Sequence, residues 1–555
     1  MSPQRSVVGS AKLIALCTLL SRISGLAREV LIAQTFGQVW IQDAFRFGFQ
    51  VPNLFRRLLG EGAMSSVFVP VFTEMLDREG RGAAARLLAR TLALLCVALL
   101  GTVVVLELLL LALWVLLPVE PGQAAARELL ISLTAVMLPF MLSICVLALL
   151  SAILNCLGSF VPAALAPVVL NVCMIVGVMW LGPGFCPRNP SGQVHVLAWT
   201  VVAAGVLQIL LVLPALWSGG LRLGWRWEPR DPTVARLLRL LVPVALGQGV
   251  LAFGVYLDAQ LCVLLTRKPN TLDTIGWLGG TVAYPLREGA LSTLSNAQLL
   301  YQFPLGVLVI SLATAAMPAF SRLAARGEWV AWAAEVRQTL RLAIFEGVLA
   351  GTLMIVLAAP IVRLLFEYRK YGAADTARTA HVLVFYGLAM WAYCAQHIVS
   401  RGFYSLGDAR TPLAISAGVL PLNVALTLVL VWFDAIREAA FAISSLLTSS
   451  LSVLVGLRIL QQRAGARVLD RAFLAGLLKM LGAAILAAAV ALALRSVIPP
   501  LAQAVPGRIG PRAIETLVPL AVGTGVFLAV GALLRLPEVS LLLSRARRRV
   551  SAAGT

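Results

Sequence analysis

The amino-acid sequence predicts an all-α membrane protein that crosses a lipid bilayer many times. Of its 555 residues, 60% are hydrophobic and only 13% are charged, whereas soluble proteins carry about a quarter charged residues. Apolar runs of the roughly 20 residues that a helix needs to cross a bilayer recur from Leu13 to Leu536. The sequence lacks the weakly alternating segments of about ten residues that are typical of a membrane β-barrel. We therefore expect one polytopic helical domain.

Charged residues and Pro or Gly breaks divide the apolar runs into about 14 predicted membrane-spanning helices. The predicted spans lie near residues 11–36, 41–75, 87–118, 129–155, 159–182, 194–217, 237–265, 292–320, 338–366, 379–405, 412–433, 436–460, 474–498 and 513–536. The second span contains Pro52 and several glycines, so we expect it to be bent or broken.

The net charge of +20 could suggest a nucleic-acid partner, but the placement of the charge argues against one. Basic residues gather in alternate interhelical loops and at the C-terminus, while the opposite loops hold few. The basic clusters lie at residues 78–90, 222–239, 322–341, 458–479 and 545–549. By the positive-inside rule, these loops and both termini face the cytoplasm, where they meet anionic lipid headgroups. Membrane lipids are expected partners, and no nucleic acid is expected.

The sequence shows no pattern typical of metal binding or of covalent catalysis. Its eight cysteines lie mostly within apolar spans and form no Cys-x-x-Cys or Cys/His ligand spacing. The three histidines are isolated, and neither a P-loop nor a nucleophile–base motif occurs. We expect no metal, no cofactor and no enzymatic activity.

Ionised side chains concentrate in the first predicted span, in the stretch SRISGLAREVLIAQTFG. Arg28 shares one helical face with Ser21 and Gly25, while Arg22 and Glu29, seven residues apart, share another. An ionised group at membrane depth costs at least a few kcal/mol, so it should face a partner or a watery cavity. The first span is therefore expected to present a polar wedge to such a cavity.

The second predicted span carries a longer polar stripe, with polar residues at steps of three or four. Its members are Asp43, Arg46, Gln50, Asn53, Arg57 and Glu61. Pro52 removes a backbone donor within the helix, and Gly60 and Gly62 loosen its end. Together with Gly25 in the first span, these residues are predicted hinges of a transporter helix.

Arginine outnumbers the acids in these two spans. The residues concerned are Arg22, Arg28, Arg46, Arg56 and Arg57 against Glu29, Asp43 and Glu61. The surplus favours an anion in the cavity, and the arginine side chain is suited to bidentate contact with phosphate. An alternative is that these charges only pair with one another, but that pairing leaves two positive charges over.

Several of these residues form recognisable motifs. They are G-x-x-R-[DE]-x-x-x-A-x-x-F-G from Gly25 to Gly37, D-A-F from Asp43, P-N-x-x-R-R from Pro52 to Arg57, E-G-A from Glu61, and YQFPLGVLVISLATAAMPAFSR from Tyr301 to Arg322. The motifs resemble those of the MurJ (MviN) family of lipid II flippases, within the multidrug/oligosaccharidyl-lipid/polysaccharide exporter superfamily. The resemblance extends over nearly the whole chain.

The resemblance implies a transporter of the inner membrane. It would carry lipid II, the undecaprenyl-pyrophosphate-linked peptidoglycan precursor, from the cytoplasmic to the outer leaflet by alternating access. Substrate contacts are then expected at Arg22, Arg28, Glu29, Asp43, Arg56, Arg57 and Glu61. We expect two six-helix lobes, at residues 1–220 and 221–465, around a central cavity. Two last helices and a basic tail, at residues 466–555, would add an apolar groove for the prenyl tail.

Energy coupling and further partners are also open to prediction. Asp258, Glu107 and Glu346 lie in other spans and are candidates to bind a coupling cation, although packing or ion pairing explains each of them equally well. The membrane potential could drive the cycle if net charge moves across the bilayer. Cell-wall synthesis proteins are further candidate partners.

One position departs from the pattern of the family. The family usually has Arg immediately before LYQLP, whereas NAQLLYQFP places Leu299 there. The segment 266–291 is longer than a simple connection needs, and it carries Arg267 and Arg287. We hypothesise that Arg287 or Arg267 supplies the missing cation from the outer side. The alternative is that this segment is a solvated loop.

Other functions are compatible with parts of this pattern. An exporter of another lipid-linked glycan would use a similar cavity. A drug/cation antiporter of the same superfamily would need a surplus of acids in the cavity, which is opposite to the balance here. A membrane scaffold that recruits cell-wall enzymes without transport would gain nothing from buried charge in the second span.

Overall fold

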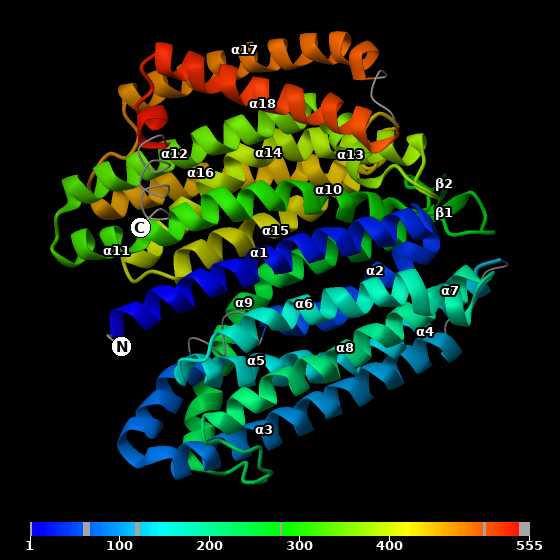
Figure 1. Cartoon of the computed structure of the whole chain (residues 1–555), viewed down its shortest axis with the longest axis vertical. Coiled ribbons are helices and arrows are strands. Elements are labelled where there is room, and N and C mark those ends of the chain that lie inside the picture. The colour runs from blue at the N-terminus through cyan, green and yellow to red at the C-terminus, as the bar shows by residue number, and fades with distance from the viewer. Residues whose placement is uncertain (1–2, 59–66, 117–121, 278–279, 503–506, 543–555) are drawn as a thin grey trace. The chain divides into compact units, whose positions relative to one another are not determined.

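A computed structural model describes residues 3–58, 67–116, 122–277, 280–502 and 507–542, most of which lie in helices (Figure 1). Within these ranges, 11 helical segments are long and apolar enough to cross a membrane. The predicted all-α, multi-span class is therefore confirmed, although the predicted number of about 14 spans is not confirmed as a count. The chain divides into two compact units, here called unit 1 (Met1–Ser292 and Arg369–Tyr371) and unit 2 (Thr293–Tyr368 and Gly372–Thr555).

Unit 1 is a helical bundle with one short hairpin. Its elements are α1 (Pro3–Phe36), α2 (Trp40–Phe55), α3 (Val69–Leu116), α4 (Ala124–Met137), α5 (Phe140–Cys156), α6 (Val161–Val176), η2 (Gly177–Leu181), α7 (Gly182–Phe185), α8 (Pro190–Ser218), α9 (Pro232–Leu265), β1 (Thr274–Trp277) and β2 (Gly280–Ala283). Side-chain caps begin two of the helices. Asn189 Oδ1 accepts from the backbone N–H of Gly192 at the start of α8, and Asp231 Oδ1 does the same for Thr233 at the start of α9.

Helix pairs in unit 1 place the polar spans against apolar neighbours. Helix α1 packs along α6, α2 packs against α4 and α9, and α5 packs against α8. Gly205 of α8 permits the last contact, because a Cβ atom there would lie 2.7 Å from the Cβ atom of Ser143 on α5. Small residues of this kind let membrane helices approach closely.

The predicted broken span at residues 41–75 contains two helices. Helix α2 ends at Phe55 after Pro52, residues 56–58 form a wide π turn, and α3 begins at Val69. Gly60 and Gly62 lie outside the described residues. Helix α3 has a further kink at Gly80, whose φ of 78° and ψ of −178° are not helical. The sequence prediction did not identify this bend.

The segment 266–291 contains a β-hairpin, which the all-α prediction did not include. Strands β1 and β2 pair antiparallel, with Thr274 opposite Ala283. The backbone N–H of Arg267 donates to the carbonyl of Leu286 at 2.9 Å, which closes the base of the hairpin. Backbone pairing of this kind needs no hydrophobic pattern, so a search for helical periodicity in the sequence does not identify the hairpin.

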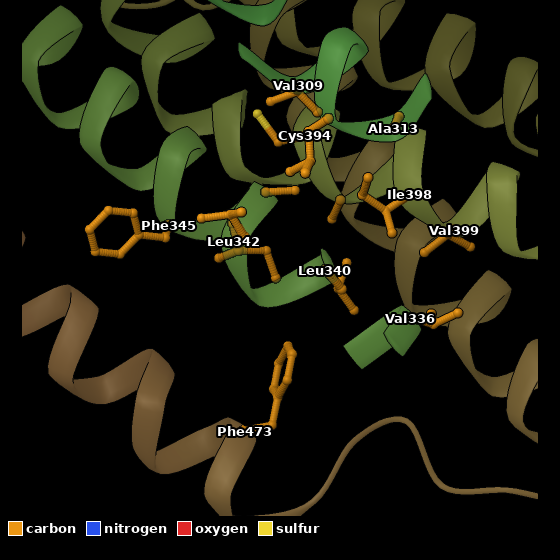
Figure 2. Packing of buried hydrophobic residues seen from close by; sticks show 14 of the residues in the cluster. Val309, Ala313, Val336, Leu340, Leu342, Phe345, Cys394, Ile398, Val399 and Phe473 are labelled. Carbon is orange, nitrogen blue, oxygen red and sulfur yellow. The ribbon is translucent and has the colours of Figure 1, made fainter. Parts of the chain in front are cut away.

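Unit 2 contains the remaining helices. They are α10 (Ala290–Pro304), whose first turn belongs to unit 1, η3 (Leu305–Val309), α11 (Ile310–Ala325), α12 (Trp329–Val356), α13 (Ala358–Phe366), α14 (Ala373–Ser405), α15 (Arg410–Leu430), α16 (Ala439–Ala464), α17 (Arg471–Ala502) and α18 (Ile509–Leu533). Figure 2 shows part of its core, where Val309, Leu342, Cys394 and Phe473 come from four different elements. Helices α17 and α18 pack on each other and on α12.

The unit boundary lies later in the chain than the predicted lobe boundary at residue 220. Helix α9 belongs to unit 1 because it packs against α2 and α3. Residues 466–542 belong to unit 2. The division into two six-helix lobes and a C-terminal pair remains a prediction about the working transporter.

Candidate functional site

The guanidinium of Arg28 is held from two sides inside unit 1. Its Nη1 donates to Asn171 Oδ1 at 2.9 Å, and its Nη2 donates to Glu29 Oε1 at 2.5 Å. The Arg28 side chain is 15% exposed. Its Nε is buried and has no hydrogen-bond partner among the described residues. An unmet buried donor costs about 1–3 kcal/mol, and more when charged, so a conformation in which this nitrogen finds an acceptor is favoured.

Glu29 joins Arg28, a predicted site residue, to Arg46 of the polar stripe in the second span. Its Oε2 lies 3.1 Å from Nη2 of Arg46, while its Oε1 binds Arg28. The side chains of Arg46 and Glu29 are 11% and 18% exposed. One carboxylate thus holds two guanidinium groups in place, and the trio keeps one net positive charge. The structure brings Arg28 and Glu29 of the first span together with Arg46 of the second.

Asn171 of α6 is a site residue that the sequence analysis missed. Its side chain is buried and its Nδ2 donates to Ser24 Oγ at 2.9 Å and to the Ser21 carbonyl at 3.1 Å. Gly25 lies beside this contact: a Cβ atom there would lie 3.5 Å from the same Nδ2, an ordinary van der Waals distance. The signal in the sequence was an isolated amide in the apolar run APVVLNVCMIV, which should find a partner in lipid.

Aromatic rings line one side of Arg28. Its Cζ lies 6.0 Å from the ring centroid of Phe49 on α2, which is within range of a cation–π contact. Phe49 in turn stacks on Phe45 and on Phe140 of α5, with centroids 6.1 Å apart in each pair. The arginine therefore has an apolar wall beside its charged groups.

Asp43 occupies a different environment from the other predicted site residues. It is fully buried, and its carboxylate accepts from the backbone N–H groups of Gly289 and Ser292, each at 2.8 Å. The Ser292 hydroxyl also donates to it at 2.6 Å. Asp43 thus caps the first turn of α10, where the helix dipole favours a carboxylate. Gly289 permits this approach: its φ is +81°, and a Cβ atom there would lie 2.2 Å from the Gln38 carbonyl oxygen.

The remaining predicted residues of the second span are only partly described. Asn53 Oδ1 accepts from Arg56 Nε at 3.2 Å, so these two residues meet after Pro52. Arg56 and Arg57 are half-buried in the π turn. Glu61 lies outside the described residues.

The last predicted positions are Arg22, the arginines of segment 266–291, and Leu299. Arg22 is half-buried on α1 and has no ion pair within the described part of the chain. Arg287 is exposed after the hairpin, and Arg267 pairs with Asp273 at 2.7 Å, with both side chains at least half exposed. Leu299, in place of the family arginine, is half-buried in α10.

The acids considered for cation binding lie on separate helices. Asp258 is on α9, Glu107 on α3 and Glu346 on α12, where Glu346 is 6% exposed. Across the residues that the structure describes, no group of three or more His, Cys, Asp or Glu side chains could hold a metal ion. The cation-binding role of these acids stays a prediction.

Comparison with known proteins identifies the family of the chain. The family model described as "Lipid II flippase MurJ" matches residues 32–504. A lipid II flippase MurJ of Burkholderia cenocepacia is 32% identical over 412 residues, covering 73% of this chain and 74% of that relative. A probable lipid II flippase MurJ of Rhizobium tropici is 30% identical over 429 residues, covering 77% and 76%.

Solved structures share the fold. A lipid II flippase MurJ in an inward closed conformation has a TM-score of 0.71 at 19% identity, covering 94% of this chain and 98% of that one. An inward-facing multidrug transporter of the MATE family has a TM-score of 0.62 at 15% identity, covering 82% and 98%. The family match and the two relatives agree over most of the chain, which therefore belongs to the MurJ family of multi-pass membrane proteins.

Proposed function

We propose that this protein is a lipid II flippase. It moves the undecaprenyl-pyrophosphate-linked precursor of peptidoglycan from the cytoplasmic to the outer leaflet of the inner membrane by alternating access. Its work is transport, without chemical change of the substrate. Both termini lie in the cytoplasm, because the basic loops and the basic C-terminal tail lie on that side.

The observation that carries this proposal is the clamped Arg28. Asn171 and Glu29 fix its two terminal nitrogens, and its buried Nε is left without a partner among the described residues. Once a conformation of the transport cycle exposes that donor, a pyrophosphate oxygen would meet it, since charge-assisted hydrogen bonds from arginine to phosphate are short and strong. The wall formed by Phe45, Phe49 and Phe140 suits the apolar part of a lipid-linked substrate.

Charge balance favours an anionic cargo over a cationic one. Glu29 serves both Arg28 and Arg46, so the described trio keeps a positive charge, and Arg22, Arg56 and Arg57 add to it. A drug/cation antiporter would need the opposite balance. An exporter of a different lipid-linked glycan would make the same contact with a pyrophosphate, so it is the second candidate function.

The energy source and the tail site follow as parts of the same proposal. Moving charge across the membrane changes the free energy by about 2.3 kcal/mol per charge per 100 mV, so the membrane potential can reset the cycle. Helices α17 and α18 offer exposed aliphatic side chains, among them Leu478, Ile485 and Val518, as a surface for the prenyl tail.

Rescue of cells depleted of their own lipid II flippase tests the proposal, with lipid II in the outer leaflet as the readout. Arg28→Ala should lose rescue, and Arg28→Lys should retain only a part, because lysine keeps the charge without the planar fork. Arg337→Ala is the matched control. Like Arg28, Arg337 makes an ion pair and further hydrogen bonds, here to two backbone carbonyls, but it lies in unit 2.

Three results would contradict the proposal: a well-expressed wild-type chain that fails to rescue, rescue by Arg28→Ala equal to that by wild type, or equal loss in the Arg337→Ala control. Rescue with no lipid II in the outer leaflet would favour another cargo.

A further inference from the structure

The connection between α8 and α9 runs along the charged end of α3 in unit 1. Gly220, with φ of +80°, turns the chain after α8. The backbone N–H of Arg226 then donates to the Ala89 carbonyl at 3.4 Å, and Arg90 pairs with Glu228 and, at 2.8 Å, with Asp231. The connection is therefore fixed to α3 at residues 89–90.

This contact places the connection at the level of the membrane surface. Helix α3 is rich in charge up to Arg90, and from Thr91 to Leu106 it contains no charged residue. The boundary between headgroups and hydrocarbon should fall at that change, because an apolar helix segment crosses the hydrocarbon and charged residues stay outside it. Residues 224–226 lie beside Ala89, at the polar side of the boundary.

The exposed part of the connection alternates basic and apolar side chains. We call it the 222–230 strip, and its members are Arg222, Leu223, Trp225, Arg226, Trp227 and Arg230. Residues 222–230 are all exposed, including 61% of Trp225 and 51% of Trp227. Exposed tryptophan at this level is typical of the aromatic belt of membrane proteins, where one end of the ring is wet and the other apolar.

The charge of the strip is uncompensated. Its acid Glu228, like the neighbouring Asp231, is bound by Arg90. Arg222, Arg226 and Arg230 have no ion pair among the described residues. Three free arginines beside two exposed tryptophans complement an anionic, half-apolar surface.

We propose that the 222–230 strip is a binding surface for anionic phospholipid headgroups of the cytoplasmic leaflet. Trp225 and Trp227 insert into the interface, and Arg222, Arg226 and Arg230 contact headgroup phosphates. The connection between α8 and α9 is thereby fixed to the bilayer as well as to α3. This surface is separate from the Arg28 site, so its test does not depend on the transported substrate.

The test uses the full-length protein in nanodiscs of phosphatidylcholine, alone or with a minor fraction of phosphatidylglycerol. Phosphatidylglycerol should raise the thermal unfolding midpoint, because a ligand of the native state stabilises it. The triple variant R222Q/R226Q/R230Q should lose most of this rise, with affinity for the anionic lipid falling about fivefold per arginine. The control R458Q/R467Q/R471Q removes the same charge from exposed sites of another basic cluster, in a stretch of unit 2 that contains no tryptophan, and should keep more of the rise.

A second measurement follows the tryptophans. Phospholipids brominated near the headgroup should quench wild-type fluorescence more than that of W225F/W227F. Equal loss of the phosphatidylglycerol effect in both triple variants would overturn the proposal, because the effect would then depend on the total charge of the protein and not on the 222–230 strip. Equal quenching of wild type and W225F/W227F would overturn it as well, since the tryptophans would then lie in water.

Discussion

Arg28 shows how one side chain can be charged and nearly buried while one of its donors stays unsatisfied. Two of its three nitrogens have fixed acceptors, and the third is buried without a partner in the described part of the chain. Because Asn171 is neutral, it orients the guanidinium without cancelling its charge. Glu29 cancels one positive charge, but its single carboxylate binds both Arg28 and Arg46. The result is a positioned cation with one unsatisfied donor.

Replacing Asn171 with alanine should therefore impair transport more than stability. Loss of a hydrogen bond to a charged donor costs about 1.5–3 kcal/mol, which corresponds to roughly a tenfold loss of flipping or more if Arg28 loses its orientation. Flipping in reconstituted vesicles and the thermal unfolding midpoint measure the two effects. Gln208→Ala is the matched control, because Gln208 is also a buried amide that bonds to α6, through the Ala166 carbonyl at 2.7 Å.

The Asn171 role would be refuted if both variants reduced flipping in proportion to their loss of stability. A selective loss in Asn171→Ala with normal unfolding is the expected result.

Asp408 offers a pH-dependent test outside the membrane-spanning segments. It lies in the turn between α14 and α15, where desolvation by burial raises its pKa, but hydrogen bonds from Thr411 and Arg410 and the guanidinium of Arg463 lower the pKa by more. The net pKa of Asp408 lies below its ordinary value of 3.8. A depressed pKa stabilises the folded state above the unfolded-state value, and this contribution disappears as the pH falls through the folded-state pKa.

Thermal unfolding of the purified protein at a series of pH values measures this contribution. Wild type should lose stability below pH 3.8 relative to Asp408→Asn, which lacks the titrating carboxylate. Parallel pH profiles of the two proteins would show that Asp408 is not the group responsible.

At the scale of elements, helices α12 and α14 approach through glycine. A Cβ atom at Gly351 would lie 2.4 Å from the Gly387 carbonyl oxygen, and one at Gly347 would lie 2.9 Å from the Cys394 Sγ. In lipid, helices gain little from hydrophobic burial, so close backbone packing contributes much of their association. This pair forms the centre of unit 2, whose core appears in Figure 2.

Gly351→Ala should destabilise unit 2 by about 1–3 kcal/mol, because the added methyl group meets backbone that cannot move alone. The midpoint of thermal unfolding in detergent checks the change. Gly418→Ala on α15 is the matched control: no atom lies within 4 Å of the added Cβ, so the change should be neutral or slightly stabilising. Equal effects of the two substitutions would mean that the α12–α14 approach carries no special constraint.

At the scale of the whole molecule, the distribution of arginine predicts the orientation in the membrane. A green fluorescent protein fused after Thr555 should fluoresce, since the basic residues of the tail keep it in the cytoplasm. Alkaline phosphatase inserted after Arg188, in a connection with little positive charge, should be active because it is exported. Active phosphatase at Thr555 and fluorescence at residue 188 would reverse the proposed topology.

The sequence by itself determined the class of the protein and the outline of its site. Within lipid, the backbone N–H and C=O groups of a twenty-residue apolar run find partners when the run forms a helix. The composition of the chain therefore predicted the fold class. Charges within such runs need a partner or a watery cavity, so the sequence predicted a polar wedge in the first span and a polar stripe in the second. The tertiary structure shows which of these charges meet: one carboxylate, Glu29, holds both Arg28 and Arg46.

Only the tertiary structure decided which residues far apart in the sequence meet. Asn171 is 143 residues from Arg28, and Ser292 is 249 residues from Asp43. Such contacts depend on which helix faces are neighbours. The sequence pattern of a helix shows which residues share a face, but it does not show which other helix packs against that face. The hairpin at 274–283 and the bend at Gly80 depend on backbone pairing and on a left-handed φ, neither of which changes the hydropathy of the chain.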